Sequence, residues 1–325
     1  NIIILLILEA YLEIVLQLEI ENKYTFPIIC IEEPEAHLHP NAQRSILKQL
    51  NKIKAQKIIS THSPYIVDQT EIKNFILFKV ENGITKTYKI PLYKPAFNFK
   101  YGLPDDAYKS TIYLKPEDKL LIKRFIQYYN PDLLFSEYII LCEGDSEKIF
   151  LENIAEMYFN LSLPQMGISV VSCQGRNYSP FLKLLKSFNI SWLILSDSEN
   201  DTLAGIKNIL TELEYPDSFY NDRIKRYKNG FDFEKALIDF YKPDKIKDFL
   251  KSRYSDNDFN KYKKNIKYPL DIGSNSIDKE ADLTEEIFID CFIENKGKPL
   301  CAFLISEAVK EKKEKLLPEI EALFN

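Results

Sequence analysis

The sequence predicts an α/β protein built on parallel strands, and three observations support this prediction. Residues 28–31, 138–142 and 192–196 are short, continuous apolar runs, which suit strands that are buried on both faces of a parallel sheet. Segments with helical spacing alternate with these runs, as they do in βαβ units. Each run also ends in a group of carboxylates. Ligands of open α/β sheets gather just beyond the carboxyl ends of strands, so these acids indicate binding sites.

The carboxylates form two groups that are far apart in the chain. The first follows the strand at 28–31 and consists of Glu32 and Glu33. The second consists of Glu143, Glu147, Asp197 and Glu199. Carboxylates this close together repel and raise one another's pKa unless a cation lies between them. The sequence therefore predicts a metal-dependent protein with two acidic centres.

Two blocks of alternating elements organise the chain. The first is expected to contain a helix at about 2–20, strands at 28–31, 57–60 and 75–80, and helices at 41–52 and from near Ser63. The second is expected to contain strands at 138–142, 168–172 and 192–196, and helices at 146–159, 179–188, 202–213, about 283–295 and 299–313. Residues 220–270 show little periodicity. We expect three segments, 1–92, 93–135 and 136–325, the middle one a connector with a helix from Pro116 to Tyr129.

The composition is that of an ordinary globular protein. Hydrophobic residues make up 45% of the 325 residues. Glu9, Glu13 and Glu19 interrupt the N-terminal apolar stretch, which is too short to span a bilayer and does not resemble a signal peptide. The net charge of −5 excludes a protein coated in basic surface, so any nucleic-acid contact must come from a local patch. We expect a cytoplasmic protein without membrane contact.

The cysteines and histidines narrow the kinds of metal site. Cys30, Cys142, Cys173, Cys291 and Cys301 show no C-x-x-C spacing. We expect buried free thiols in a reducing compartment rather than disulfides or zinc ligands. All three histidines lie in the first 62 residues, so a histidine-rich metal site elsewhere is excluded.

Two motifs of the first block resemble those of a nucleotide-hydrolysing family. E-E-P-E-A-H-L-H-P at 32–40 follows one strand, and S-T-H-S-P at 60–64 follows the next. They resemble the Walker B segment, D-loop and switch histidine of ABC-type ATPases of the RecF, SMC and OLD group. The resemblance implies that Glu32 holds Mg²⁺, Glu33 polarises the attacking water and His62 contacts the γ-phosphate of ATP. In the alternative interpretation, Glu33 and Glu35 are solvated charges at a helix entry and His62 neighbours a helix N-cap.

The ATP site of this chain is incomplete at the sequence level. A phosphate-binding loop requires G-x-x-x-x-G-K-[ST], whose backbone N–H groups hold the phosphates. No such run and no ABC signature segment occurs in the sequence. Either the preceding half of the ATPase lies outside these residues or this lobe has lost hydrolysis. We expect the former, so that residues 1–92 are the C-terminal lobe of an ABC-type ATPase and this chain alone does not turn over ATP.

The second block resembles the Toprim domain of topoisomerases, bacterial primases and OLD-family nucleases. The resemblance rests on E-G-D-S-E at 143–147 and D-S-E at 197–199. It implies that all four acids of the second group bind metal and that Glu143 and Asp197 are catalytic. Toprim domains usually carry Asp-x-Asp, so Glu199 departs from the pattern by one methylene.

Local geometry indicates that Glu143 and Glu147 can bind one ion, and each of these residues also has a purely structural interpretation. Glu143 leaves a strand end directly, Gly144 allows a tight turn, and Glu147 lies one turn into the following helix, so both carboxylates can reach one ion. Gly175 matches the glycine before the second Toprim helix, and a simple turn glycine is the alternative. Glu147 is alternatively an exposed, solvated acid in the first turn of a helix, favoured by the helix dipole. Asp197 is alternatively the N-cap acid of the helix at 202–213 or a loop charge.

The chemistry of the ligands selects the metal. Oxygen ligands without histidine or cysteine favour Mg²⁺ or Mn²⁺ over zinc. Two such ions about 4 Å apart would activate water and stabilise the leaving oxygen of a phosphodiester.

The order of the two domains extends the resemblance to the OLD family, which includes the Gabija antiviral nuclease. It covers 2–80 and 136–310 and implies the C-terminal portion of an ABC-type ATPase lobe followed by a Toprim nuclease domain (136–325), whose parallel sheet is flanked by helices. Two weaker matches are G-F-D-F-E at 230–234 and K-G-K-P at 296–299.

The resemblance assigns roles within these two segments. Asp232 and Glu234 would complete a second metal site. Lys298 would neutralise the charge of the transition state, and Lys296 is the alternative lysine. For all four residues a solvated surface charge is the plainer interpretation.

A basic segment is the candidate DNA contact. Residues 223–267 hold fourteen Lys or Arg against seven Asp or Glu, a local excess of 14 − 7 = +7, and tyrosines are interleaved with them. This composition suits phosphate contact and base stacking. A solvated, loop-rich insertion is the alternative.

These expectations lead to one leading hypothesis. It is a metal-dependent DNA endonuclease regulated by an ATPase lobe, and the family resemblance implies anti-phage defence, a homo-oligomer and a helicase-like partner protein. The alternatives are a topoisomerase- or primase-like enzyme and a non-catalytic, ATP-responsive scaffold. A topoisomerase would need a catalytic tyrosine on a separate domain, and a primase a zinc ribbon or a helicase-contact region. Neither is visible in the sequence.

Overall fold

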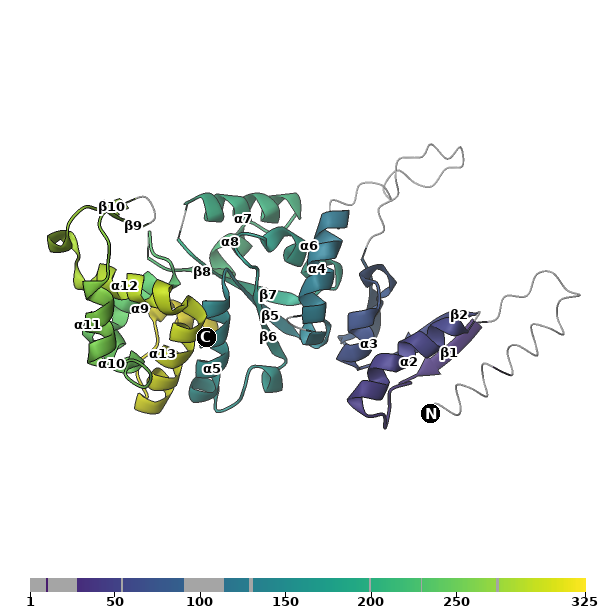
Figure 1. The fold of residues 1–325 in the computed structure, drawn as a ribbon. Coiled ribbons are helices and arrows are strands. Elements are labelled where there is room, and N and C mark those ends of the chain that lie inside the picture. The colour runs from purple at the N-terminus through teal and green to yellow at the C-terminus, as the bar shows by residue number, and fades with distance from the viewer. Residues whose placement is uncertain are drawn as a thin grey trace, which may run out of the picture. The chain divides into compact units, whose positions relative to one another are not determined.

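The structure is a computed structural model of the chain, and its described residues form two compact units (Figure 1). It describes residue 10 and residues 28–53, 55–90, 114–128, 131–198, 200–228, 230–272 and 275–325. The first unit comprises the described residues of Asn1–Tyr93 and Leu114–Phe135, and the second those of Ser136–Asn325. The helix expected at about 2–20 therefore lies outside the described residues, apart from Ala10.

The first unit combines a parallel strand pair, a hairpin and short helices. Its elements are β1 (Ile28–Glu32), α2 (Pro40–Lys52), β2 (Gln56–Ser60), α3 (Pro64–Gln69), β3 (Leu77–Glu81), β4 (Ile84–Tyr88) and α4 (Pro116–Tyr128). β1 and β2 pair in parallel, with Glu32 opposite Ser60. The amphipathic helix α2 buries Ile46, Leu47 and Leu50 against this pair. The parallel pairing brings the loops after β1 and β2 to one edge.

The second unit is built on a four-stranded parallel sheet in the order β6-β5-β7-β8. The strands are β5 (Tyr138–Cys142), β6 (Ile168–Ser172), β7 (Ser191–Ser196) and β8 (Ile224–Arg226). After β5 the chain moves to one side for β6, and after β7 it moves to the other side for β8. Adjacent strands whose connections leave in opposite directions form the switch point at which open α/β sheets bind ligands. That point lies between the carboxyl ends of β5 and β7.

Helices flank this sheet, so the predicted α/β class with a parallel sheet is confirmed. The helices connecting the strands are α5 (Asp145–Phe159), α6 (Tyr178–Ser187) and α7 (Asn200–Glu212). Two further helices, α12 (Glu285–Lys296) and α13 (Lys298–Lys312), follow near the C-terminus, and α13 packs along α5. α14 (Pro318–Phe324) ends the chain and was not predicted.

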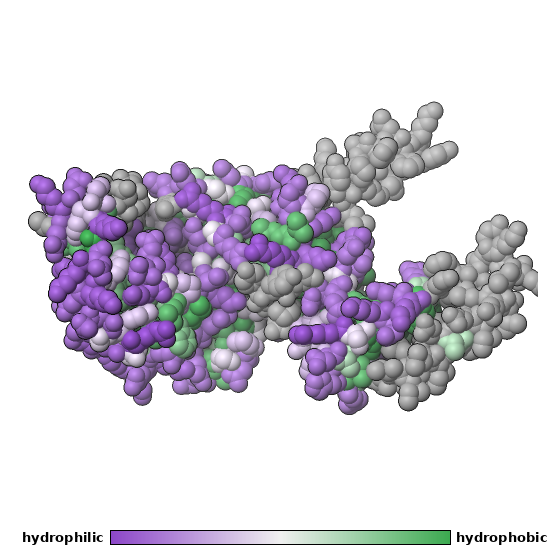
Figure 2. Space-filling view, viewed as in Figure 1, coloured by the Kyte–Doolittle hydropathy of each residue, from purple (hydrophilic) through white to green (hydrophobic). Residues whose placement is uncertain are grey.

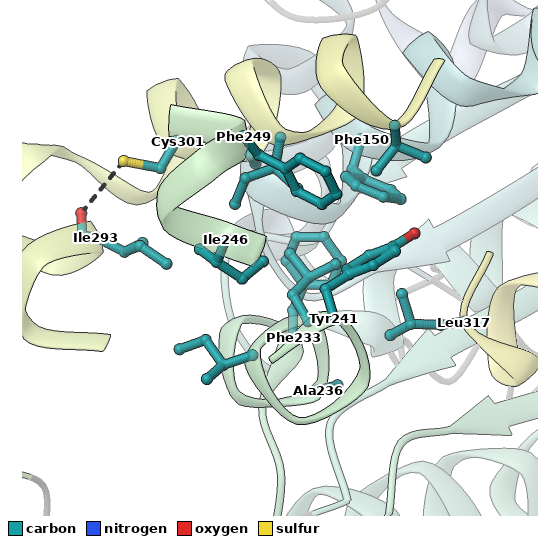
Figure 3. Close-up of a cluster of buried hydrophobic side chains, with 14 of the residues drawn as sticks. Phe150, Phe233, Ala236, Tyr241, Ile246, Phe249, Ile293, Cys301 and Leu317 are labelled. Carbon is teal, nitrogen blue, oxygen red and sulfur yellow. Dashed lines mark hydrogen bonds between the residues drawn. The ribbon is translucent and has the colours of Figure 1, made fainter. Parts of the chain in front are cut away.

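Regular elements fill most of the stretch over 220–270, where the sequence shows little periodicity, so the loop-rich interpretation of the basic segment is wrong. This stretch contains β8, α9 (Phe233–Tyr241), α10 (Pro243–Leu250) and α11 (Asp256–Lys264). α8 (Ser218–Asp222) lies at its start, and the antiparallel strands β9 (Leu270–Ile272) and β10 (Asn275–Ile277) lie at and beyond its end. Phe233, Tyr241 and Phe249 from α9 and α10 pack with Phe150 of α5 in the main core (Figure 3). Elements this short do not fill the window of about 11–18 residues over which periodicity is recognised.

Two further expectations can be compared with the described residues. No helix among them is long and apolar enough to cross a membrane. All five cysteines are free, and four of them are buried. Cys30 is exposed, which corrects the prediction of a buried thiol, because the outer face of β1 is uncovered in the described part of the chain.

Candidate functional site

Three acids of the second group, Glu143, Glu147 and Asp197, lie at the switch point of the parallel sheet. Glu143 follows the last residue of β5, and Asp197 follows the last residue of β7, its neighbour in the sheet. Glu147 lies in the first turn of α5 and is only 4% exposed. The solvated-charge interpretation of Glu147 is therefore wrong, and the structure brings the three acids together.

Gly144 has a different role from the one expected. Its φ of −128° is an ordinary extended conformation, so the turn itself does not require glycine. A Cβ added at this position would lie 2.9 Å from Oε2 of Glu147. Glycine at this position leaves the Glu147 carboxylate in its place, whereas a side chain would require that carboxylate to shift. Gly175 does need its flexibility, since its φ is +90°, and its N–H donates to the Glu143 carbonyl over 2.8 Å.

The electrostatics confirm that the carboxylates are close to one another. Burial and, to a smaller extent, the charges of Glu147, Glu143, Asp232 and Glu234 together raise the pKa of Asp197 to about 8. Burial also raises the pKa of Glu147 to about 7, with contributions from Glu234 and Glu143. Acids from separate stretches of the chain therefore share one electrostatic environment, and a bound cation would relieve their repulsion.

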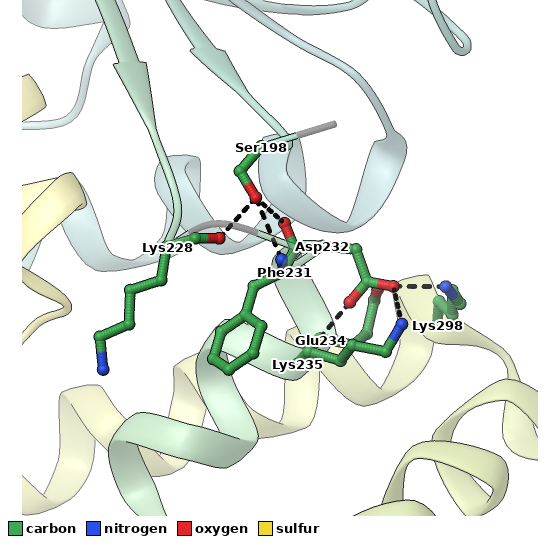
Figure 4. Close-up of polar contacts among 7 residues, drawn as sticks. All are labelled: Ser198, Lys228, Phe231, Asp232, Glu234, Lys235 and Lys298. Atoms are coloured by element: carbon green, nitrogen blue, oxygen red, sulfur yellow. Dashed lines mark hydrogen bonds and ion pairs between the residues drawn. The ribbon is translucent and has the colours of Figure 1, made fainter. Parts of the chain in front are cut away.

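Ser198, the residue after Asp197 in the chain, contacts the segment that carries Asp232 and Glu234 (Figure 4). Its hydroxyl donates to the carbonyls of Lys228 and Phe231 and accepts from the Phe231 N–H over 3.0 Å. Ser198 is 4% exposed. No local sequence pattern marks Ser198 as a site residue, because its partners lie about thirty positions away.

Glu234 and Lys298 form an ion pair at this site. Lys298 Nζ lies 3.2 Å from Oε2 of Glu234, whose side chain is 8% exposed. Burial lowers the pKa of Lys298, but Glu234, Asp232 and Asp290 outweigh it, so the pKa is raised overall. The lysine therefore stays charged, and the solvated-charge interpretation of Glu234 is wrong. Asp232 is partly structural, because it caps α9 by accepting from the Lys235 N–H over 2.9 Å.

Lys296, the alternative lysine, lies in another environment. Its Nζ is 5.8 Å, 5.9 Å and 5.4 Å from the ring centroids of Tyr254, Tyr262 and Phe292. These cation–π contacts hold the end of α12 against α11. The geometry therefore favours Lys298 as the lysine that serves the acidic group.

Asp290 of α12 is an acid that the sequence analysis missed. Burial raises its pKa to about 6, and Asp232 raises it while Lys235 and Lys298 lower it. It therefore lies near the Glu234–Lys298 pair. No local pattern marks it, because α12 is brought there by packing against α9.

The donors fit a hard divalent cation in their chemistry but are not preassembled. Among the described residues, no three acidic, histidine or cysteine side chains already have the geometry of a metal site. All candidate donors are carboxylate oxygens, which suit Mg²⁺ or Mn²⁺. Oδ1 of Asp197 is buried and has no hydrogen-bond partner in the described part of the chain, which leaves it available to a cation. Glu199 lies outside the described residues.

The first acidic group brings Glu33 and His62 together. Glu32 ends β1 and is exposed. Oε1 of Glu33 lies 3.4 Å from Nε2 of His62, whose side chain is 87% exposed. Glu33 has a φ of +42°, a conformation that is rare for residues other than glycine and frequent at functional sites. Burial and Glu35 raise the pKa of Glu33, and His62 opposes them.

Glu35 joins the two loops of this group. It is 6% exposed, so the interpretation of Glu35 as a solvated charge is wrong. Its Oε1 accepts from the Thr61 hydroxyl, from the His62 N–H over 3.2 Å and from the Ser63 N–H over 3.1 Å. One carboxylate oxygen thus fixes the loop that carries His62.

The basic segment of 223–267 is folded, and several of its charges are paired. Lys245 contacts Glu314 over 2.6 Å, and Lys247 pairs with Glu285. Tyr227 and Tyr241 are buried, which argues against base stacking by these two. Figure 2 shows a largely hydrophilic surface over α10 and α11. Phosphate contact by this surface remains a prediction.

Comparisons with known proteins agree with these two centres. Residues 134–198 match the overcoming lysogenization defect protein-like TOPRIM domain, and residues 1–67 match an AAA ATPase domain. Endonuclease GajA of Bacillus cereus (strain HuB5-5) is 26% identical over 195 residues, which are 54% of this chain and 27% of that protein. The Old nuclease of Escherichia phage P2 is 26% identical over 240 residues, 71% of this chain and 38% of that protein.

A solved structure shows a partial likeness as well. The C-terminal region of the Xanthomonas campestris pv. campestris OLD protein is 21% identical, with a TM-score of 0.42, and the match covers 59% of this chain and 92% of that one. The matched residues span less than two fifths of the full length of GajA or the Old nuclease. The resemblance expected from the motifs is confirmed: the chain carries an OLD-like TOPRIM domain at 134–198 and an AAA ATPase domain match at 1–67.

Proposed function

We propose that this chain is the catalytic part of a metal-dependent DNA endonuclease that an ATPase lobe regulates. The supporting observation is the convergence of Glu143, Glu147 and Asp197 at the switch point between β5 and β7. The matching OLD-like TOPRIM domain and the names of the relatives, endonuclease and nuclease, agree with it.

Each acidic residue has a role in this proposal. Glu143, Glu147 and Asp197 would bind one Mg²⁺ or Mn²⁺, with Glu199 beside them, and Asp232 and Glu234 would serve a second ion. The ions would supply an activated water and stabilise the leaving oxygen. Glu143 and Asp197 would orient the attack on the phosphodiester.

Lys298 would act on the substrate rather than on the metal. Its pairing with Glu234 keeps its ammonium charged next to the acids. A cation fixed there would stabilise the negative charge that develops on the phosphate in the transition state. The basic surface of α10 and α11 would contact the DNA backbone.

The first unit would supply regulation through ATP. Glu32 would hold Mg²⁺, Glu33 would polarise water and His62 would contact the γ-phosphate, and the contact between Glu33 and His62 supports this assignment. The remaining ATP-binding elements would come from outside these residues. We further propose a homo-oligomer that acts in the cytoplasm in anti-phage defence, with a helicase-like partner protein.

The test is nicking of supercoiled plasmid DNA by the purified chain with Mg²⁺, Mn²⁺ or Ca²⁺, with and without ATP. We expect nicking with Mg²⁺ or Mn²⁺, and its loss in Glu143→Ala and Asp197→Ala. Glu156→Ala is the matched control, because Glu156 lies on α5 but its carboxylate faces Lys310 over 2.7 Å. Trp192 is 1% exposed in β7, so its fluorescence reports whether each variant is folded. Unchanged nicking by both site variants would reject the proposal.

A further inference from the structure

Tyr227 presents a buried hydroxyl whose role the proposed metal site does not explain. It follows the last residue of β8 and is 2% exposed. Its ring centroid lies 6.0 Å from that of Phe233, so the ring has a packing role in the core. The hydroxyl has no hydrogen-bond partner in the described part of the chain. A buried donor without an acceptor is costly, and its presence requires a reason.

The register of the sheet places Tyr227 beside Asp197. The parallel pairing of β7 and β8 ends with Ser196 opposite Arg226, so Asp197 and Tyr227 are the next residues on the two strands. The Tyr227 N–H donates to the Ser196 carbonyl over 3.4 Å, which continues the ladder by one bond. Residues opposite each other in a sheet extend their side chains from the same face.

A carboxylate oxygen on the neighbouring residue Asp197 lacks a hydrogen-bond donor in the described part of the chain. Oδ1 of Asp197 is buried and, like the hydroxyl, has no hydrogen-bond partner among the described residues. Burial raises the pKa of the Tyr227 hydroxyl, and the charges of Glu147, Asp197, Cys142 and Glu234 contribute in the same direction. A donor without an acceptor and an acceptor without a donor therefore occupy neighbouring positions at the carboxyl edge of the sheet.

We propose that Tyr227 is a positioning residue whose hydroxyl donates a hydrogen bond to the Asp197 carboxylate when that carboxylate holds the divalent cation. This inference rests on the proposed metal site and adds a residue outside its acidic motifs. The hydrogen bond fixes which oxygen of Asp197 faces the cation. Metal-binding carboxylates generally depend on such outer hydrogen bonds, whose loss weakens metal binding by about 10–100-fold.

The test is a calorimetric titration of the metal-free chain with Mn²⁺, together with its thermal unfolding followed by Trp192 fluorescence. Tyr227→Phe keeps the buried ring and removes only the hydroxyl. We expect it to weaken Mn²⁺ binding by about tenfold or more, while Tm of the metal-free chain is unchanged or higher, because an unsatisfied buried group is removed.

Tyr241→Phe is the matched control. Tyr241 is 5% exposed in the same unit, and its hydroxyl donates to the Lys315 carbonyl over 2.6 Å. Removing that hydroxyl is expected to lower Tm and leave Mn²⁺ affinity unchanged. The contrast between the two variants separates metal positioning from ordinary structural hydrogen bonding.

The outcomes distinguish this inference from the proposed function. If the unmodified chain binds Mn²⁺ and Tyr227→Phe binds it equally well, the inference is overturned and the metal site stands. If Tyr227→Phe lowers Tm as Tyr241→Phe does, the hydroxyl is a structural donor and the inference is again overturned. Failure of the unmodified chain to bind Mn²⁺ would overturn the metal site itself.

Discussion

The two acidic centres of this chain differ in the hydrogen-bond donors that surround their carboxylates. In the first, Oε1 of Glu35 accepts hydrogen bonds from Thr61, His62 and Ser63, while its Oε2 is buried without a hydrogen-bond partner in the described part of the chain. In the second, Asp197 is buried near four other carboxylates, and its Oδ1 has no hydrogen-bond partner among the described residues. A buried ionised carboxylate is stabilised when hydrogen-bond donors surround it. It destabilises the folded state when other carboxylates surround it. The difference identifies Glu35 as a structural acid and Asp197 as one suited to a cation.

The largest expected effect is the loss of nicking when Lys298, the lysine that pairs with Glu234, is replaced. Lys298→Ala should lower nicking by about 10²–10³-fold, because a preorganised charge at the transition state is lost, while Mn²⁺ binding persists. Plasmid nicking and Mn²⁺ titration measure the two effects. Lys296→Ala is the control, since its charge faces three aromatic rings, and it should cost about 1 kcal/mol of stability without affecting nicking. The reverse result would assign the role to Lys296.

The structural role of Glu35 is tested by local stability. Glu35→Ala should destabilise the loop at 60–63 by about 3 kcal/mol, because three donors lose a charged acceptor. Amide hydrogen exchange at His62 and Ser63 should accelerate by roughly a hundredfold. Glu71→Ala, which removes an exposed acid of the same unit, should leave both amides unchanged. Unaltered amide exchange in Glu35→Ala would show that Glu35 does not stabilise this loop, and the proposed difference between the two centres would then be wrong.

The second centre should make the metal-free chain less stable as pH rises. Asp197 and Glu147 have ordinary pKa values of 3.8 and 4.5, and folding raises them to about 8 and about 7. Between pH 4 and 8 the folded state therefore binds more protons than the unfolded state. Its unfolding free energy should fall, by about 1.4 kcal/mol per pH unit for each extra proton. Urea unfolding followed by Trp192 fluorescence measures this slope.

Two additions sharpen the pH experiment. Mn²⁺ should restore stability mainly at the upper end of the range, where the acids are ionised. Asp197→Asn combined with Glu147→Gln should flatten the slope. If the unfolding free energy of the unmodified chain did not change with pH, the pKa values of these carboxylates would not be raised by folding.

The smallest expected effect concerns the space that Gly144 leaves for Glu147. Gly144→Ala would place a methyl group 2.9 Å from Oε2 of Glu147, and crowding of this kind costs about 1 kcal/mol or more. It should also weaken Mn²⁺ binding. Gly205→Ala in α7 is the control, because its Cβ would meet no atom within 4 Å, and it should stabilise the helix by about 0.5–1 kcal/mol. Similar effects of the two substitutions would contradict the proposed role of Gly144.

The sequence predicted those parts of the fold whose signals are local. The strands β5 and β7 are continuous apolar runs, and the acids Glu143 and Asp197 follow them at the positions expected. β8 has three residues and α9 has nine, too few for a periodic pattern to emerge from a Lys-rich background.

Site residues that depend on distant contacts could not be read from the sequence. Ser198 is defined by carbonyls about thirty residues away, Tyr227 by the register of β8, and Asp290 by the packing of α12 against α9. Such contacts exist only once the chain has folded.

The central claim is that Glu143, Glu147 and Asp197 converge on one divalent cation. The most direct measurement is anomalous diffraction from crystals of the chain grown with Mn²⁺. We predict a manganese peak at the carboxyl ends of β5 and β7, within about 2.5 Å of oxygens from these three residues. Carboxylates that point apart, with no anomalous density between them, would contradict the proposal.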